Sequence, residues 1–195
     1  MTTQPVPADA GAVRILGIAG SLRLASYNRA LLRAAAAMTP PGVELTIWDG
    51  LKAIPPFDED DEPAPAAVID LRAAIATCDA LLVVTPEYNG SLPGQLKNAL
   101  DWASRPRAES VLRGKPAAAC GASPSPSGAR SAQGDLRRVL ARAGAQVVET
   151  QLAVPAAYQA FGADGELNDP ELRRALGDLL VHLAEATRPT TRIAA

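Results

Sequence analysis

Short segments that are almost continuously apolar alternate with longer helical patterns along this chain, and this alternation constrains the fold more than any other feature. Three of the apolar segments indicate strands covered on both faces: Val13–Ala19, Ala80–Val84 and Pro116–Cys120. Two others suit edge strands, namely Val43–Ile47, where apolar and polar residues alternate, and the shorter, more polar Gln146–Thr150. Five strands that are each followed by a helix predict an α/β fold with a parallel, doubly wound sheet and right-handed crossovers.

Each predicted helix presents one apolar face. The five stripes consist of Leu31, Ala34, Ala35 and Met38; of Val68, Leu71, Ile75 and Cys78; of Leu96, Ala99, Leu100 and Ala103; of Leu136, Val139, Leu140 and Ala143; and of Leu172, Leu176, Leu179 and Leu183. The last helix is expected to begin after Asp169, which would act as its cap, with Pro170 in the first turn.

The alternation in Val43–Ile47 also predicts the order of the strands. If the second strand lies at an edge, the first and third strands are neighbours in the middle, and the order is 2-1-3-4-5. Ligands of such sheets bind outside the carboxyl ends of the strands, at the point where the crossovers change direction. The loops that concern function therefore follow Ala19, Val84 and Cys120.

Size, charge and cysteine content narrow the class of protein further. The 195 residues, 48% hydrophobic and 21% charged, suit one globular domain at 12–187 between a flexible lead at 1–11 and a tail at 188–195. A net charge of −2 gives no electrostatic argument for nucleic acid or an anionic membrane, and no apolar run approaches the roughly 18 residues of a membrane span.

Cys78 and Cys120 lie in apolar segments without metal-binding spacing and are expected to be buried thiols. The lead lacks the basic-then-apolar order of a signal peptide, so we expect a cytoplasmic protein.

The first loop, Gly20–Asn28, gathers Ser21, Arg23, Ser26 and Asn28 where an apolar strand runs into a helix. Hydroxyl, guanidinium and amide donors beside the exposed N–H groups of a helix N-terminus favour a phosphate site. Neither the dinucleotide fingerprint GxGxxG nor the triphosphate motif GxxxxGK[ST] occurs here. The alternative is a helix that is simply capped by Ser26, with Arg23 in solvent.

The other two loops could border a flat ligand. In Thr85–Gly94, Tyr88 offers an aromatic face, and Gly90 allows the backbone to approach a ring closely. The alternative is a rigid turn with Tyr88 packed on the surface. The third loop, Gly121–Arg130, is small and proline-rich, and it could supply Ser123 as a donor or be a plain connector.

Together these segments resemble the NADPH-dependent FMN reductase family, which includes enzymes described as quinone, azo-dye and chromate reductases. The resemblance is carried by GSLR-x-x-S-x-N after the first strand, by TPEYNGSLPG-x-LKNALDW after the third strand and by SGAR before the fourth helix. It extends from about Val13 to about Val148, and the PEYN segment with its helix is the most specific part. It implies a flavodoxin-like fold, bound FMN as the cofactor, and NADPH or NADH as co-substrate.

The resemblance also assigns the site. The FMN phosphate would be held by the first loop, the isoalloxazine ring would be bordered by the second, and the third would close the site. The residues that it implies are Ser21, Arg23, Ser26 and Asn28 for the phosphate, then Pro86, Glu87, Tyr88, Asn89 and Gly90 for the ring, and Ser123.

The expected reaction places the chemistry on the flavin, so no catalytic side chain and no metal ligand is assigned. A reduced nicotinamide would pass a hydride to the flavin and leave, and a small acceptor such as a quinone would then take two electrons at the same place. A one-electron flavodoxin-type carrier remains an alternative, although such carriers are usually strongly acidic. A non-enzymatic flavin-binding sensor is a second alternative. The acidic run Asp58–Glu62, set between prolines, is expected to be a solvated loop.

The sequence also predicts that the chain forms an oligomer. Family members generally pair through the helix after PEYN, which implies that Lys97–Trp102 lies at a dimer contact. Trp102 also lies off the apolar stripe of its helix, and an exposed aromatic side chain on a globular domain indicates a contact surface. We therefore expect a homodimer, or a homotetramer built from two dimers, with Trp102 in the contact.

Overall fold

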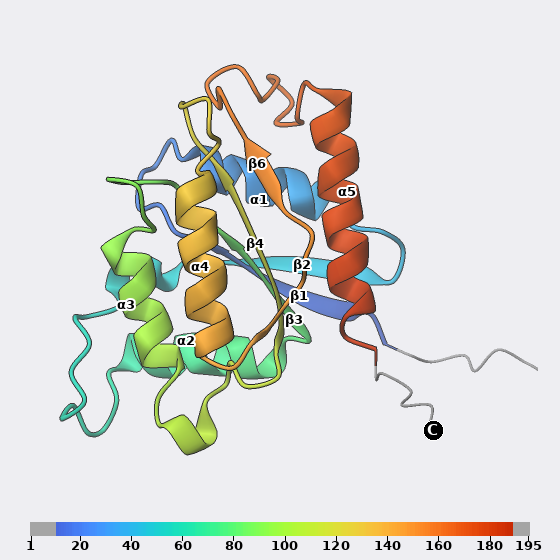
Figure 1. Ribbon diagram of the computed structural model, residues 1–195. Helices are drawn as coiled ribbons and strands as arrows, with labels where there is room; N and C mark the ends of the chain where they lie inside the picture. The colour runs from blue at the N-terminus through green and yellow to red at the C-terminus, as the bar shows by residue number, and fades with distance from the viewer. Residues whose placement is uncertain (1–10, 189–195) are drawn as a thin grey trace, which may run out of the picture.

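The computed structural model describes residues 11–188, and it has a central parallel sheet with helices on both faces (Figure 1). The strand order β2-β1-β3-β4-β5 confirms the flavodoxin-like order expected from the sequence. The strands are β1 (Val13–Ala19), β2 (Val43–Trp48), β3 (Ala80–Val84), β4 (Pro116–Ala122), β5 (Gln146–Val147) and β6 (Leu152–Val154). Of the predicted lead and tail, only Gly11 and Arg188 fall within the described residues.

The helices cover two apolar cores, one on each face of the sheet. One core is closed by α1 (Tyr27–Ala37) and α5 (Pro170–Glu185), and the other by α2 (Ala66–Thr77), α3 (Gly94–Ala103) and α4 (Arg130–Arg142). Two short 3-10 helices are η1 (Gly50–Ala53) and η2 (Arg107–Glu109). No helix between residues 11 and 188 is both long enough and apolar enough to span a membrane.

The edge beyond β4 differs from the expectation of one continuous strand at Gln146–Thr150. The chain pairs with the start of β4 through β5, leaves the sheet, and returns as β6 to pair with the end of β4. The three residues of β6 therefore extend the sheet toward the carboxyl end of β4, and they place the segment after Val154 beside the third loop.

Trp102 is buried, which corrects its expected place at an exposed contact. Its side chain is 2% exposed, and its indole N–H donates to the carbonyl oxygen of Pro55 at 3.0 Å. The ring of Phe57 meets the indole edge-on, with centroids 4.9 Å apart. Asn98, one turn earlier on α3, accepts from the backbone N–H of Phe57 and donates to Pro55, both at 2.7 Å. The LKNALDW motif thus fastens the segment 55–57 to α3 inside one chain.

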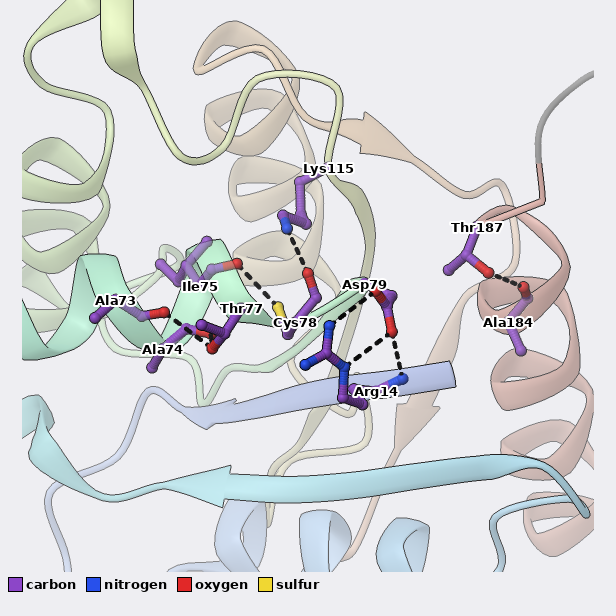
Figure 2. Close-up of polar contacts among 10 residues, drawn as sticks. All are labelled: Arg14, Ala73, Ala74, Ile75, Thr77, Cys78, Asp79, Lys115, Ala184 and Thr187. Atoms are coloured by element: carbon purple, nitrogen blue, oxygen red, sulfur yellow. Dashed lines mark hydrogen bonds and ion pairs between the residues drawn. The ribbon is translucent and has the colours of Figure 1, made fainter. Parts of the chain in front are cut away.

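Polar contacts close the amino-terminal edge of the sheet, away from the three loops (Figure 2). Arg14, in β1, donates to the Asp79 carboxylate from its backbone N–H at 2.8 Å and from its guanidinium. This backbone hydrogen bond is the main reason that the pKa of Asp79 is lowered. The Lys115 ammonium donates to the carbonyl of Cys78 at the C-terminal end of α2, where the helix dipole favours a cation. These four residues line a cavity of about 680 Å³. The charges of Arg14 and Asp79 neutralise each other, and the Lys115 ammonium is bound to the C-terminal end of α2.

The two cysteines are free and buried, as the sequence predicts. Burial is the main cause of a raised pKa at both thiols, and it raises the pKa of Cys120 to about 12. Both groups are therefore protonated and weakly reactive near neutral pH.

Candidate functional site

The three loops lie together because β1, β3 and β4 are consecutive in the sheet and run in the same direction. The backbone N–H of Gly20 donates to the carbonyl of Val84 at 2.8 Å, and that of Thr85 donates to Cys120 at 2.9 Å. Each loop therefore starts from a fixed point beside the next. The helix after β1 covers one face of the sheet and the helix after β3 covers the other, so this edge is the switch point of the fold.

The first loop presents backbone donors toward solvent at the start of α1. Ser26 caps the helix, and its hydroxyl accepts from the backbone N–H of Arg29 at 3.3 Å. Among the hydrogen bonds of residues 11–188, none takes up the backbone N–H of Leu22, Leu24 or Ala25. Unpaired N–H groups beside a helix N-terminus fit an anion such as a phosphate.

Arg23 and Ser21 lie at the same place with different surroundings. The Arg23 side chain is exposed, and no carboxylate within the described residues forms an ion pair with it. Ser21 is buried, and its hydroxyl accepts from the backbone N–H of Arg23 at 3.4 Å. The first loop therefore combines a cation that forms no ion pair within residues 11–188 with backbone N–H groups that have no partner there.

Asn28 joins the first loop to the third. Its side chain is 3% exposed, and its amide nitrogen donates to the carbonyl of Ala122 at 3.1 Å. The amide oxygen accepts from the backbone N–H of Ala122 at 3.0 Å. Asn28 thus satisfies both polar groups of the last residue of β4. This contact positions α1 against β4, a structural role that comes in addition to the phosphate role implied by the resemblance.

The second loop contains a tight turn at Tyr88–Ser91. The backbones of these two residues exchange hydrogen bonds of 3.0 and 3.1 Å, and Asn89 and Gly90 between them have φ angles of 51° and 78°. Two consecutive positive φ angles at an Asn-Gly pair are typical of a type I′ turn. The turn projects Tyr88, Asn89 and Gly90 into solvent, and Tyr88 is 50% exposed.

Pro86 and Glu87, at the base of the turn, face the protein. Pro86 is buried, and its carbonyl accepts from the Thr85 hydroxyl at 2.8 Å. The Glu87 carboxylate accepts from the backbone N–H groups of Ser131 and Ala132 at 3.0 and 3.2 Å, so it satisfies two donors in the first turn of α4. What these residues offer to a ligand is therefore their backbone and their position.

The third loop is held by a chain of three hydroxyls. Ser123 lies 3.0 Å from Ser125, and Ser125 lies 2.9 Å from Ser127, measured between the Oγ atoms. Gly128, with a φ of 58°, packs so closely on β6 that a Cβ would meet the backbone of Val154 at 2.9 Å. Ser123 is buried and lies at the base of the loop, where its backbone N–H donates to Val154 at the end of β6 and its carbonyl accepts from the N–H of Ala157, both at 3.1 Å.

Tyr158 belongs to the same edge of the molecule, although nothing in the sequence assigns it a role. It follows β6, whose carboxyl end lies beside Ser123, and it is 59% exposed. With Leu22 and Leu24 on the first loop and Tyr88 on the second, it makes four exposed large apolar side chains on loops at the carboxyl ends of strands.

The residues present fit FMN. Free N–H donors and one unpaired cation suit its phosphate, while the Asn-Gly turn and the apolar side chains suit its ring. A 2-1-3-4-5 sheet with three such loops at its switch point is the architecture of the flavodoxin-like flavoprotein class.

Comparisons with known proteins agree with this class. Residues 13–159 match the family model described as NADPH-dependent FMN reductase. The chain is 43% identical over 164 residues to an NAD(P)H-dependent FMN reductase of Pseudomonas aeruginosa, covering 83% of this chain and 88% of that one. It is 44% identical over 131 residues to a 2-hydroxy-1,4-benzoquinone reductase of a Burkholderia species, covering 67% and 71%.

A solved structure extends the likeness to nearly the whole molecule. FerB of Paracoccus denitrificans, a flavoenzyme NAD(P)H:(acceptor) oxidoreductase, superposes with a TM-score of 0.83 at 31% identity. The match covers 90% of this chain and 97% of FerB. The chain belongs to the NADPH-dependent FMN reductase family.

Proposed function

We propose that this chain is an NAD(P)H-dependent oxidoreductase that binds FMN at the carboxyl edge of its sheet and reduces quinones by two electrons. The observation that carries the proposal is the first loop, which has free N–H groups and the uncommitted Arg23 and starts at the switch point beside the loop that carries the Tyr88 turn. The activities of the similar proteins, an NAD(P)H-dependent FMN reductase and quinone reductases, support the nicotinamide donor and the quinone acceptor.

One group of residues would bind the phosphate of FMN, and another would border its isoalloxazine ring. Ser21, Arg23, Ser26 and the backbone of the first loop would hold the phosphate, and Asn28 would keep that loop against β4. The backbone of 86–90 and the ring of Tyr88 would border the isoalloxazine, with Ser123 below it. When bound, FMN supplies the hydride and electron chemistry that no protein side chain supplies.

Riboflavin, which has the ring of FMN but no phosphate, gives a direct test of the site. Each charge-assisted contact is worth about 1.5–3 kcal/mol, so FMN should bind at least about tenfold more tightly than riboflavin. Titration of the apo-protein, followed by quenching of flavin fluorescence, measures both dissociation constants. Equal affinities would contradict a phosphate site in the first loop. Steady-state oxidation of NADPH with benzoquinone, by the FMN-loaded protein, tests the activity.

We also propose that the chain assembles as a homodimer or homotetramer in the cytoplasm. Because Trp102 is buried, it offers no contact surface. Two oppositely charged surface regions support assembly instead. A groove of about 480 Å³ between α3 and α4 is lined by Lys97, Arg105, Arg107, Arg113 and Arg142, with Asp101 as its one carboxylate among the described residues. The exposed acidic loop 58–62 lies next to it, held by an ion pair from Glu59 to Arg105 at 3.3 Å. Adjacent patches of opposite charge complement themselves across a two-fold axis. The free thiols and the nicotinamide donor suit a reducing compartment.

A further inference from the structure

The second loop is fastened to α4 at both ends of its turn. Before the turn, the Glu87 carboxylate accepts from the backbone N–H groups of Ser131 and Ala132. After the turn, the Ser91 hydroxyl donates to the Asp135 carboxylate, with 2.6 Å between Oγ and Oδ2. Both attachments therefore lie within the first two turns of α4.

Asp135 is itself held in place on α4. The Arg138 guanidinium donates to its other carboxylate oxygen at 2.6 Å, from the next turn of the helix. The Ser91 hydrogen bond is the main cause of a lowered pKa at Asp135, and Arg138 lowers it further against the opposing effect of burial. Asp135 is therefore ionised at neutral pH, and an ionised acceptor makes a stronger hydrogen bond than a neutral one.

The turn between these attachments has little other support. Tyr88, Asn89 and Gly90 are exposed, and the recorded backbone bonds of the turn join only Tyr88 to Ser91. A projecting turn of this kind keeps its direction only if its two ends are fixed. Glu87 fixes the first end, and Ser91 connects the second end to a rigid helix.

We propose that Asp135 is a positioning residue for flavin binding, acting through Ser91 to hold the Tyr88–Gly90 turn in the orientation that borders the isoalloxazine ring. The inference rests on the proposed function for the identity of the ligand, whereas the attachment itself belongs to the chain alone. Asp135 does not touch the flavin in this account. It orders the turn before the flavin arrives, and binding then costs less conformational entropy.

Four variants and one control test the proposal by FMN titration of the apo-protein. Asp135→Ala and Ser91→Ala should each raise the FMN dissociation constant by about tenfold, because each removes the same charge-assisted hydrogen bond. The double variant should be no weaker than either single variant, since two residues of one contact are not additive. Asp135→Asn keeps an oxygen acceptor for Ser91 and should stay within about threefold of the wild type. Glu149→Ala removes another carboxylate that pairs with α4 and should leave FMN affinity unchanged, because the Glu149 side chain is 97% exposed and its one ion pair among the described residues is with Arg137.

Amide hydrogen exchange of the apo-protein separates this inference from the proposed function. Asp135→Ala should accelerate exchange at residues 88–91 and leave the core strands as protected as in the wild type. If the wild type bound no FMN, the proposed function would fail, while the exchange result would still decide whether Asp135 holds the turn. Unchanged exchange at 88–91, an unchanged FMN dissociation constant, or additive single effects would each overturn the role of Asp135.

Discussion

Arg23 is the residue on which the phosphate assignment depends most directly. It is exposed and has no carboxylate partner between residues 11 and 188, so its removal costs the folded apo-protein nothing that the structure shows. A lost charge-assisted contact of about 1.5–3 kcal/mol should weaken FMN binding by roughly one to two orders of magnitude in Arg23→Ala. Arg33, exposed on α1, provides the matched control, and Arg33→Ala should bind FMN like the wild type. Equal affinities of the two variants in a fluorescence titration would remove Arg23 from the site.

Two variants of Tyr88 distinguish a packing role of its ring from a proton-transfer role of its hydroxyl. Tyr88→Phe keeps the ring, so reduction of bound flavin by NAD(P)H should survive within about tenfold. Tyr88→Ala removes the ring from the half-exposed turn, so FMN retention should fall more than in the Phe variant. Stopped-flow absorbance measures the first effect and gel filtration with flavin quantification the second. Loss of flavin reduction in a Tyr88→Phe variant that retains its FMN would show that the hydroxyl takes part in catalysis.

Among elements, the joint between α1 and β4 depends on Asn28. Asn28→Ala leaves the buried N–H and carbonyl of Ala122 without partners, and each unsatisfied group costs about 1–3 kcal/mol. The free energy of unfolding of the apo-protein should therefore fall by about 2–6 kcal/mol, measured by urea denaturation. Asn168→Ala is the matched control, because Asn168 is exposed and its amide makes one contact, to Gln159; it should cost less than about 1 kcal/mol. If Asn28→Ala were as stable as the control and lost only FMN affinity, the structural role would be wrong.

The helices and strands were largely predictable, because a buried strand or a helix with one buried face shows as a local pattern of apolar residues in the sequence. β1 and β3 begin and end at the predicted residues, and Asp169 caps α5 through its side chain, as expected. Ser26 caps α1, which is the contact that the alternative interpretation of the first loop gave it. The return of the chain as β6 was not predicted, because three residues are too few to show a period. Their pairing with β4 is a tertiary contact that leaves no local record.

The site was predictable as three loops, but its internal contacts were only partly so. The Asn89–Gly90 pair carries the signal for a type I′ turn in the sequence itself. The partners of Glu87 and Ser91 lie on α4, more than forty positions away, and only the folded chain brings them together. Trp102 was misplaced for the same reason, since the ring that covers it comes from the distant Phe57.

For the whole molecule, assembly through opposite charges predicts that charge-reversed variants lose pairing alone and regain it when they are mixed. Light scattering at micromolar concentration should give the wild type two or four times the 20.2 kDa mass of one chain. Reversing charges on the acidic loop, with Asp60→Lys and Asp61→Lys, should shift the protein toward the monomer, and so should Arg107→Glu with Arg142→Glu in the groove. An equimolar mixture of the two variants should recover paired chains, because in a mixed pair both loop-groove contacts again join opposite charges. A monomeric wild type, or variants that remain fully paired, would refute this interface.

The central claim concerns electron flow through a flavin held at the carboxyl edge of the sheet. The most direct measurement is the visible absorbance of the FMN-loaded protein without oxygen. One equivalent of NADPH or NADH should bleach the absorbance of the oxidised flavin, and one equivalent of benzoquinone should restore it, since two electrons pass in each step. If the absorbance persisted in the presence of both nicotinamides, the protein would bind a flavin without serving as an NAD(P)H-dependent reductase, and the account would be contradicted.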